Sequence, residues 1–238
     1  MKKIFTDGLK DGLPIALGYL AVSFSFGMTA SAQNVPVWVA IALSALNLTS
    51  AGQFSALTLM CKSAPLAEIA AATFVINIRY LLMSIVLSQK LVKMPIVARM
   101  AIAFGVTDEI FTVASTKPHK VGFTYMSGLI LAPYFGWCLG TSLGALAGNL
   151  LGDAISSALG IGLYAMFIAI VIPEAKSDKS VAFAAGIAVA ISCVFQWWSF
   201  LSSISAGWAV IIASVPAAAI AALVFPRNEE VNETQATN

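Results

Sequence analysis

The chain has 238 residues, a formal net charge of +2, 59% hydrophobic residues and 10% charged residues. Its mean hydropathy is +0.90. Soluble domains carry about 25% charged residues, so this composition excludes an ordinary water-soluble protein and makes membrane lipid its surroundings. The basic residues are scattered and form no patch, which excludes nucleic acid as a partner.

The cysteines and the single histidine offer no metal site. Cys61, Cys138 and Cys193 each stand alone in an apolar run, and His119 is the only histidine. No CxxC spacing or histidine cluster is present, so a disulfide framework and a zinc site are both excluded. We expect the cysteines to be small apolar core residues and the protein to need no cofactor.

The N-terminus resembles a signal peptide, with two lysines, an apolar run from Leu13 and the motif Ala30-Ser31-Ala32. Small and polar residues such as Gly18 interrupt the run, and further hydrophobic segments follow at once. We therefore predict an uncleaved first transmembrane span.

Hydrophobic segments long enough to span a membrane fill most of the chain, since a spanning helix needs about 20 apolar residues. Seven stretches qualify: 13–33, 35–60, 65–89, 121–149, 154–173, 181–200 and 204–225. An eighth, 95–116, inserts only if Asp108 and Glu109 are satisfied inside the protein. We predict an all-α, polytopic transmembrane helix bundle of seven or eight spans. Residues 1–225 form one transporter domain, and residues 226–238 form a polar tail.

Basic residues in the short loops give conflicting orientations. Lys2, Lys3 and Lys10 place the N-terminus in the cytoplasm, and the turns 33–36 and 149–153, which lack lysine and arginine, belong outside. The basic segment 90–99 then conflicts with Lys62 unless stretch 35–60 or stretch 95–116 fails to cross. A broken or re-entrant element would remove the conflict.

Weak internal similarity suggests a two-fold repeat. Gly27 followed by the run Gly52–Ala56 is similar to Gly140 followed by the run Gly162–Met166. Repeats are common in secondary transporters. Because glycine is also common in membrane helices, chance similarity remains an equal alternative.

A polar run interrupts the second stretch. Asn47-Leu48-Thr49-Ser50-Ala51-Gly52-Gln53 contains several residues that are unfavourable inside a helix. In lipid, such a run is stable only where it lines protein or water. We predict a helix break whose Asn47, Ser50, Gly52 and Gln53 bind a solute. The alternative is a kinked packing helix.

The helix predicted over 65–89 carries polar residues on two faces. One stripe holds Thr73, Asn77, Tyr80, Ser84 and Ser88, and the opposite face holds Glu68 and Arg79. This pattern predicts a helix enclosed by protein or water on both sides. We add Asn77 and Tyr80 to the substrate-binding residues.

Arg79 lies near the middle of that helix, where a charge costs about 2.5–3.5 kcal/mol without a partner. Glu68 shares its face but lies about 16 Å away along the axis, which excludes a direct pair. Asp108, Glu109 and backbone carbonyls are the available partners. Arg79 has either a functional role or a structural one, pinning the bundle together.

Asp108 and Glu109 form an adjacent acidic pair after Gly105-Val106-Thr107. Burial and a neighbouring carboxylate both favour protonation of such a pair, which could carry a proton near neutral pH. We assign Glu68, Arg79, Asp108 and Glu109 to proton coupling or ion pairing. The alternative for the acidic pair is a turn exposed to water.

Four glycines, Gly136, Gly140, Gly144 and Gly148, follow one another at intervals of four residues, and Gly152 continues the series. This spacing places them on one helix face, where a neighbouring backbone can approach closely. The ladder predicts tight helix packing.

Five motifs together resemble those of the AzlC family, the large subunit of two-component branched-chain amino acid exporters linked to azaleucine resistance. They are the runs 8–14 (GLKDGLP), 50–54 (SAGQF), 77–84 (NIRYLLMS), 107–111 (TDEIF) and 164–169 (YAMFIA). The resemblance extends over nearly the whole chain. It is strong up to about Pro173 and weak after it.

The resemblance implies export of leucine, isoleucine and valine, with methionine as a further candidate, together with a small AzlD-type membrane subunit. Family members are often labelled ABC permeases. This chain has no GxxxxGK[ST] phosphate loop, which an ABC permease would keep on a separate subunit.

We therefore expect a multi-pass protein of the bacterial inner membrane that exports small-molecule amino acid substrates, driven by proton antiport. A passive channel or a permease subunit for another small neutral solute is the alternative. A membrane enzyme is disfavoured, because the chain has one histidine, no metal-ligand cluster and no GxSxG-type nucleophile.

Overall fold

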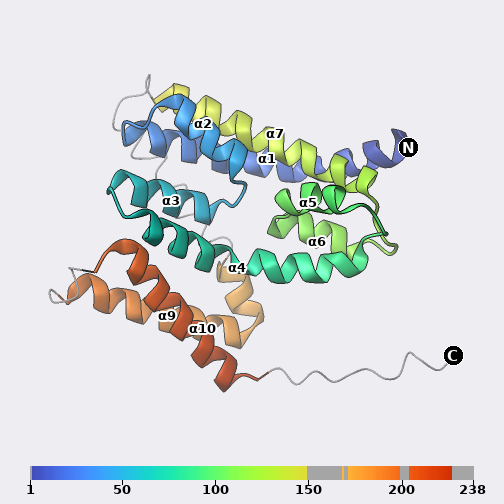
Figure 1. Cartoon of the computed structure of the whole chain (residues 1–238). Coiled ribbons are helices and arrows are strands. Elements are labelled where there is room, and N and C mark those ends of the chain that lie inside the picture. The colour runs from blue at the N-terminus through green and yellow to red at the C-terminus, as the bar shows by residue number, and fades with distance from the viewer. Residues whose placement is uncertain (1, 149–167, 169–170, 199–203, 227–238) are drawn as a thin grey trace. The chain divides into compact units, whose positions relative to one another are not determined.

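The computed structural model describes residues 2–148, 168, 171–198 and 204–226, and these are almost entirely helical (Figure 1). The named helices are α1 (Lys2–Ala32), α2 (Val37–Leu46), α3 (Ala51–Cys61), α4 (Leu66–Lys90), α5 (Ile96–Phe104), α6 (Asp108–Thr116), α7 (Phe123–Gly148), α9 (Lys179–Trp197) and α10 (Ala206–Val224). The predicted all-α membrane bundle is confirmed. The contacts divide the chain into two compact units, Met1–Phe167 and Ile168–Asn238.

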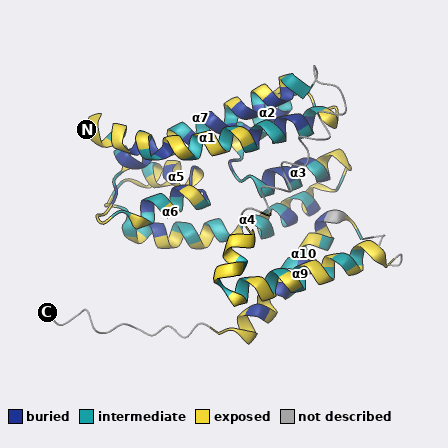
Figure 2. Ribbon diagram, turned by 180° about the vertical axis from the view of Figure 1, so that it is seen from behind, coloured by how far each residue is buried: buried dark blue, intermediate teal, exposed yellow. Residues whose placement is uncertain are grey.

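The first unit is organised around α1 and α7, which make the most extensive contact between described helices. The two helices run parallel: Gly8 lies against the backbone of Tyr125 and Leu129, and Gly27 lies against Thr141, Gly144 and Ala145. Buried residues follow both helices along their length (Figure 2). Glycine permits this approach because a Cβ atom at either position would collide with the opposite backbone.

The glycine ladder lies on the same interface. Gly136, Gly140 and Gly144 meet the backbone of α1 at Ala16, Leu20 and Phe24, one turn apart in each helix. Gly148 meets the side chain of Ser31. Gly152 lies outside the described residues.

A first helix hairpin, α2–α3, enters the unit from the C-terminal end of α1. The start of α2 at Ala40 and the second half of α3 at Leu57 share one hydrophobic cluster with Ala30. The chain breaks between the two helices at Asn47–Ser50, beside the middle of α7. The predicted interruption is therefore present, with Gly52 and Gln53 in the first turn of α3.

A second hairpin, α5–α6, enters from the opposite end. Met94 and Ile102 belong to a cluster with Ala114 and Val121, at the end where α7 begins. The chain breaks at Gly105–Thr107, where Gly105 lies against the side chain of Ile130 in α7. Thr107 caps α6 by accepting a hydrogen bond from the Ile110 amide.

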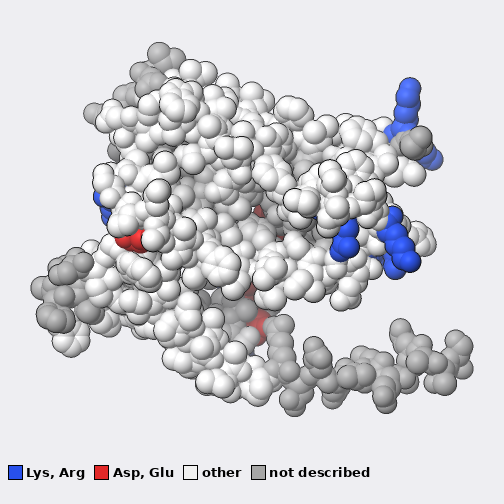
Figure 3. All heavy atoms as spheres, viewed as in Figure 1, with Lys and Arg blue, Asp and Glu red and all other residues white. Residues whose placement is uncertain are grey.

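Helix α4 runs antiparallel to α1 and α7. Its C-terminal residue Leu91 forms an isolated bridge with Val121, just before α7. Lys90, Lys93 and Arg99 therefore lie at the same end as the N-terminus and Lys117, and we call this the basic end. In Figure 3, most blue side chains on the visible face of this unit gather there.

The two hairpins remove the conflict in the loop charges. Because α2–α3 and α5–α6 each return to the end from which they enter, the segment 90–99 shares the basic end with the N-terminus, and Lys62 lies at the opposite end. Helices α1–α3 and helices α4–α6 thus have the same order of elements, a long helix followed by a hairpin of two short helices. The two sets run in opposite directions. This relation differs from the predicted repeat, whose second motif, Gly162–Met166, lies outside the described residues.

The expected count of seven or eight spans is not confirmed. Among the described residues, five helices are long and apolar enough to cross a membrane: α1, α4, α7, α9 and most of α10. Stretches 35–60 and 95–116 are each two short helices, because helix-breaking residues divide them. Most of stretch 154–173 lies outside the described residues.

In the second unit, α9 and α10 pack against each other. Phe183 near the start of α9 meets Phe225 after α10, with ring centroids 5.5 Å apart, so the helices are antiparallel. Residues 171–177 are also helical.

The α1–α7 interface gives a stability prediction. In Gly140→Leu, the new side chain collides with Leu20 and Ser23, so we expect a loss of about 1–3 kcal/mol or more in unfolding free energy. Thermal unfolding in detergent measures it. Gly18→Leu in α1 is the matched control, because nothing lies within 4 Å of the position that its Cβ atom would take. Equal melting of the two variants would contradict the proposed role of the ladder.

Candidate functional site

A chain of polar and aromatic side chains links the two helix breaks through the middle of the first unit. The Tyr19 hydroxyl on α1 donates to Glu109 Oε2 and lies 2.6 Å from Thr107 Oγ1, at the start of α6. The Tyr19 ring meets Trp137 of α7 edge to face, with centroids 5.3 Å apart. The Trp137 indole N–H donates to Gln53 Oε1 in the first turn of α3 over 3.0 Å. Each half-helix start is therefore tied to the α1–α7 pair.

This series of contacting side chains continues into α2. Gln53 Nε2 donates to Ser44 Oγ over 2.6 Å, and Ser44 Oγ lies 2.6 Å from Thr141 Oγ1 of α7. Gln53, Ser44 and Thr141 are fully buried. Buried polar groups that satisfy one another fix their orientations and hold the hairpin in register with α7. We call Glu109, Tyr19, Trp137, Gln53, Ser44 and Thr141 the polar chain.

Arg79 pairs with Asp108, one of the partners open to it from the sequence. Arg79 Nη1 lies 2.6 Å from Asp108 Oδ2, which joins α4 to the N-terminus of α6. Its Nη2 also donates to the Tyr80 hydroxyl over 3.2 Å, and its guanidinium lies 4.9 Å from the Tyr80 ring centroid. The ion pair neutralises the arginine and one of the two adjacent carboxylates.

Asn77 lies beside the α2–α3 break. A Cβ atom on Gly52 would lie 2.7 Å from Asn77 Nδ2 and from Thr49 Oγ1, so a side chain here would displace Asn77 and Thr49 from the break. Asn77 Oδ1 and Thr73 Oγ1 are buried without a hydrogen-bond partner among the described residues. Unsatisfied buried oxygens are uncommon in folded proteins.

Ser50 at the break has a strained backbone. Its φ of 46° and ψ of −95° fall in a region that non-glycine residues rarely adopt. Such strain clusters at ligand-binding and switch regions. Asn47 ends α2 in an extended conformation and accepts a hydrogen bond from the Thr49 hydroxyl.

The remaining predicted residues lie elsewhere. Glu68 is buried in the first turn of α4, at the end opposite the basic end. The expectation that α4 is enclosed on both sides is not met within its unit, where Phe74, Ile78 and Leu82 are exposed. Arg79 instead reaches Asp108 with its long side chain, so it needs no surrounding protein on its own face.

Four members of the polar chain, Tyr19, Trp137, Ser44 and Thr141, were not predicted from the sequence. Tyrosine and tryptophan are expected at the ends of membrane helices, in the aromatic belts. Tyr19 and Trp137 stand near the middle of their helices instead, and that position is the signal that could have identified them. Nothing in the sequence around Ser44 and Thr141 indicated that they belong to the site.

A second ion pair lies at the basic end and joins the segment after α6 to α1. Lys117 Nζ lies 2.7 Å from Asp11 Oδ2, which also accepts from the Tyr125 hydroxyl over 2.6 Å. Hydrogen bonding to Asp11 raises the pKa of Lys117. Because that pKa is raised, the lysine's contribution to stability is present at neutral pH and is lost as the pH rises above the ordinary lysine range.

Within the described part of the chain, no group of three or more His, Cys, Asp or Glu side chains could hold a metal ion. The polar chain consists of hydrogen-bonding and aromatic side chains together with one carboxylate, that of Glu109.

Comparison with known proteins identifies the family. The AzlC protein family matches residues 14–151. An uncharacterized membrane protein of Archaeoglobus fulgidus is 33% identical over 195 residues, covering 79% of this chain and 84% of the relative. The inner membrane protein YgaZ of Escherichia coli K12 is 26% identical over 198 residues, covering 80% and 81%. No solved structure gives a significant match.

The fold and these matches define a multi-pass membrane protein with a transport role. The chain belongs to the AzlC family, as its motifs suggested.

The Arg79–Asp108 pair gives a second prediction. Removing one partner of a buried pair costs about 3–5 kcal/mol, and an exposed pair contributes about 0–1 kcal/mol. The side chains here are 41% and 43% exposed, so we expect an intermediate loss for Arg79→Gln. The double variant Arg79→Gln/Asp108→Asn should recover part of that loss in thermal unfolding, because no charge is left unpaired. Additive losses would show that the pair does not couple α4 to α6.

Proposed function

We propose that this protein is the large subunit of an exporter of branched-chain amino acids, with leucine, isoleucine and valine as substrates and methionine as a further candidate. It works by proton antiport in the bacterial inner membrane, together with a small AzlD-type subunit. The observation that carries the proposal is the polar chain, which joins two interrupted helix pairs inside an apolar bundle. Interrupted helices near mid-membrane are typical of solute sites in secondary transporters.

The solute site in this proposal is the α2–α3 break, formed by Asn47, Ser50, Gly52, Gln53, Asn77 and Tyr80. The oxygens of Asn77 and Thr73, which lack a hydrogen-bond partner among the described residues, suit the ammonium group of an amino acid. The amide groups at the start of α3 suit the carboxylate, because a helix N-terminus carries partial positive charge.

The apolar part of the substrate also has a complement at this break. Leu48 and Phe54 are both buried beside it, and the Phe54 ring packs edge to face on Phe26. Small-solute sites are mostly apolar with a few placed polar groups, which fits a branched aliphatic side chain.

Glu109 is the proton carrier in this proposal. Asp108 is held by the positive charge of Arg79, whereas Glu109 accepts from the neutral hydroxyl of Tyr19. A carboxylate that accepts from a neutral donor can gain and lose a proton without breaking an ion pair. Glu109 and Gln53 belong to the same polar chain, so protonation at α6 and solute binding at α3 can influence each other.

The basic end supports a cytoplasmic N-terminus. It gathers Lys2, Lys3, Lys10, Lys90, Lys93, Arg99, Lys117 and Lys120, whereas the opposite end of the unit carries Lys62. Cytoplasmic loops are enriched in lysine and arginine. The α5–α6 hairpin and its acidic pair are then reached from the cytoplasm, and the α2–α3 hairpin from outside.

The direct test is efflux of preloaded radiolabelled leucine from cells that express the chain with its small subunit. We expect efflux against a concentration gradient, stopped by a protonophore and reduced to background in Arg79→Ala or without the subunit. Arg79→Lys tests geometry, since lysine lacks the planar fork of arginine. Efflux that only follows the leucine gradient would indicate a passive channel. Wild-type efflux in a properly inserted Arg79→Ala would exclude a functional role for this arginine.

A further prediction concerns the break itself. Gly52→Val brings a side chain against Asn77 and Thr49, so export should fall at least about tenfold while membrane insertion is retained. Gly186→Val is the control, because its Cβ position is open.

In a cysteine-free background, Ser50→Cys should react with a small aqueous thiol reagent and be protected by leucine. Thr116→Cys, exposed at the basic end, should react with or without leucine. Labelling of Ser50→Cys that saturating leucine leaves unchanged, with transport intact, would rule out a solute site at the break.

A further inference from the structure

A groove of about 340 Å³ lies between the last turns of α4 and helix α5, apart from the polar chain. Its floor is buried and apolar, formed by Leu87, Ile102 and Val106. Its rim is open, since Ile96 and Met100 are 67% and 66% exposed. The groove therefore opens sideways from the first unit at the basic end.

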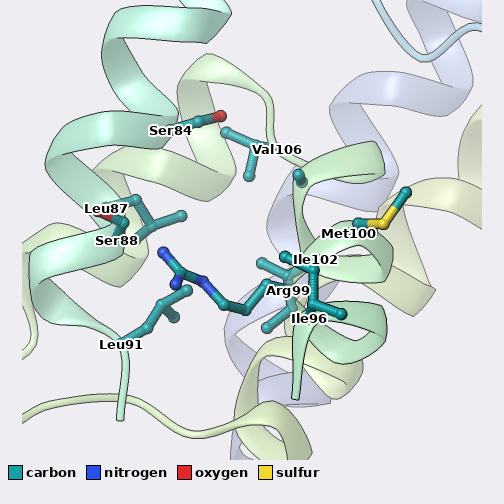
Figure 4. Close-up of a pocket in the computed structure, with 10 residues that line it drawn as sticks. Ser84, Leu87, Ser88, Leu91, Ile96, Arg99, Met100, Ile102 and Val106 are labelled. Carbon is teal, nitrogen blue, oxygen red and sulfur yellow. The ribbon is translucent and has the colours of Figure 1, made fainter. Parts of the chain in front are cut away.

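One positive charge enters this groove. Figure 4 shows Arg99 extending from α5 towards α4, with its guanidinium group close to Leu87 and Ser88. No ion pair of Arg99 is formed among the described residues. Ser84 and Ser88 supply hydroxyl groups on the α4 wall, and Lys90 and Lys93 follow in the linker. Arg99 is the charged residue among those that line the groove, so the groove favours an anion over a cation.

The residues that line this groove suit a different kind of ligand from that of the proposed substrate site. An amino acid is a zwitterion, and its ammonium group needs an anionic or orphaned acceptor. No acidic residue lines the groove, and the Ser88 hydroxyl already donates to the Ile85 carbonyl. The groove instead matches a molecule with one anionic head and a long apolar part.

We propose that this groove binds an anionic phospholipid, with its phosphate on Arg99 and one acyl chain along Leu87, Ile102 and Val106. Basic pockets between membrane helices at the cytoplasmic side commonly recognise anionic headgroups. The open rim admits a chain sideways from the bilayer. The lipid would join α4 to α5 and so set the position of the α5–α6 hairpin. This site is independent of the transported substrate.

The test uses the purified full chain in detergent, titrated with phosphatidylglycerol or phosphatidylcholine and followed by thermal unfolding and native mass spectrometry. Phosphatidylglycerol should raise the melting temperature and bind, and phosphatidylcholine should do so more weakly. Arg99→Gln should weaken phosphatidylglycerol binding about fivefold, in line with one basic contact. Ala103→Leu, which narrows the groove without changing charge, should also weaken it.

The control is Lys62→Gln, which removes a basic residue at the opposite end and should bind as the wild type does. Equal effects of the two lipids, or unchanged binding by Arg99→Gln, would overturn the proposal. Glycerol phosphate that binds as well as the lipid would show a site for free anions only. Leucine that displaces phosphatidylglycerol from the wild type would reassign the groove to the transported solute.

Discussion

The rest of the structure depends on enclosing interrupted backbone within an apolar bundle. Hydrocarbon offers no hydrogen bonds, so a helix can break at membrane depth only where protein or water surrounds it. Here α1, α4 and α7 form the frame, and the breaks at residues 47–50 and 105–107 both lie against it. The polar side chains of the three long helices can then bind the short helices that follow the two breaks. Tyr19, Arg79 and Trp137 each meet the first turn of a half-helix.

The sequence predicts the helical class and the first break well, because both rest on local chemistry. Asn47, Thr49 and Ser50 disfavour a helix interior wherever they occur. The hairpins themselves could be predicted only as an option. Stretch 35–60 is as long as a membrane span, and its return to the same end depends on the hydrophobic cluster to which Ala40 and Leu57 both belong. Periodicity and length contain no information on that choice.

The candidate site shows the same limit. A charge at the position of Arg79 requires a partner, and the sequence narrows the choice to a few groups, among which the structure shows Asp108. For Tyr19 and Trp137, the position in the middle of a membrane helix is unusual for an aromatic residue with a polar group, but it does not indicate which partner each one meets. Their roles arise only when α1 and α7 lie parallel and in register. That register depends on backbone contacts at Leu20 and Gly140, which no residue pattern within either helix specifies.

The parallel pairing of α1 and α7 has a consequence for biosynthesis. Asp11 and Tyr125, which hydrogen-bond across this pair, are 114 residues apart in the chain. At the usual rate of translation, α1 waits on the order of ten seconds in the bilayer before its partner is made. During that time its glycine face has no matching helix from its own chain. Until α7 is made, this face of α1 is therefore open to other small-residue helices in the bilayer.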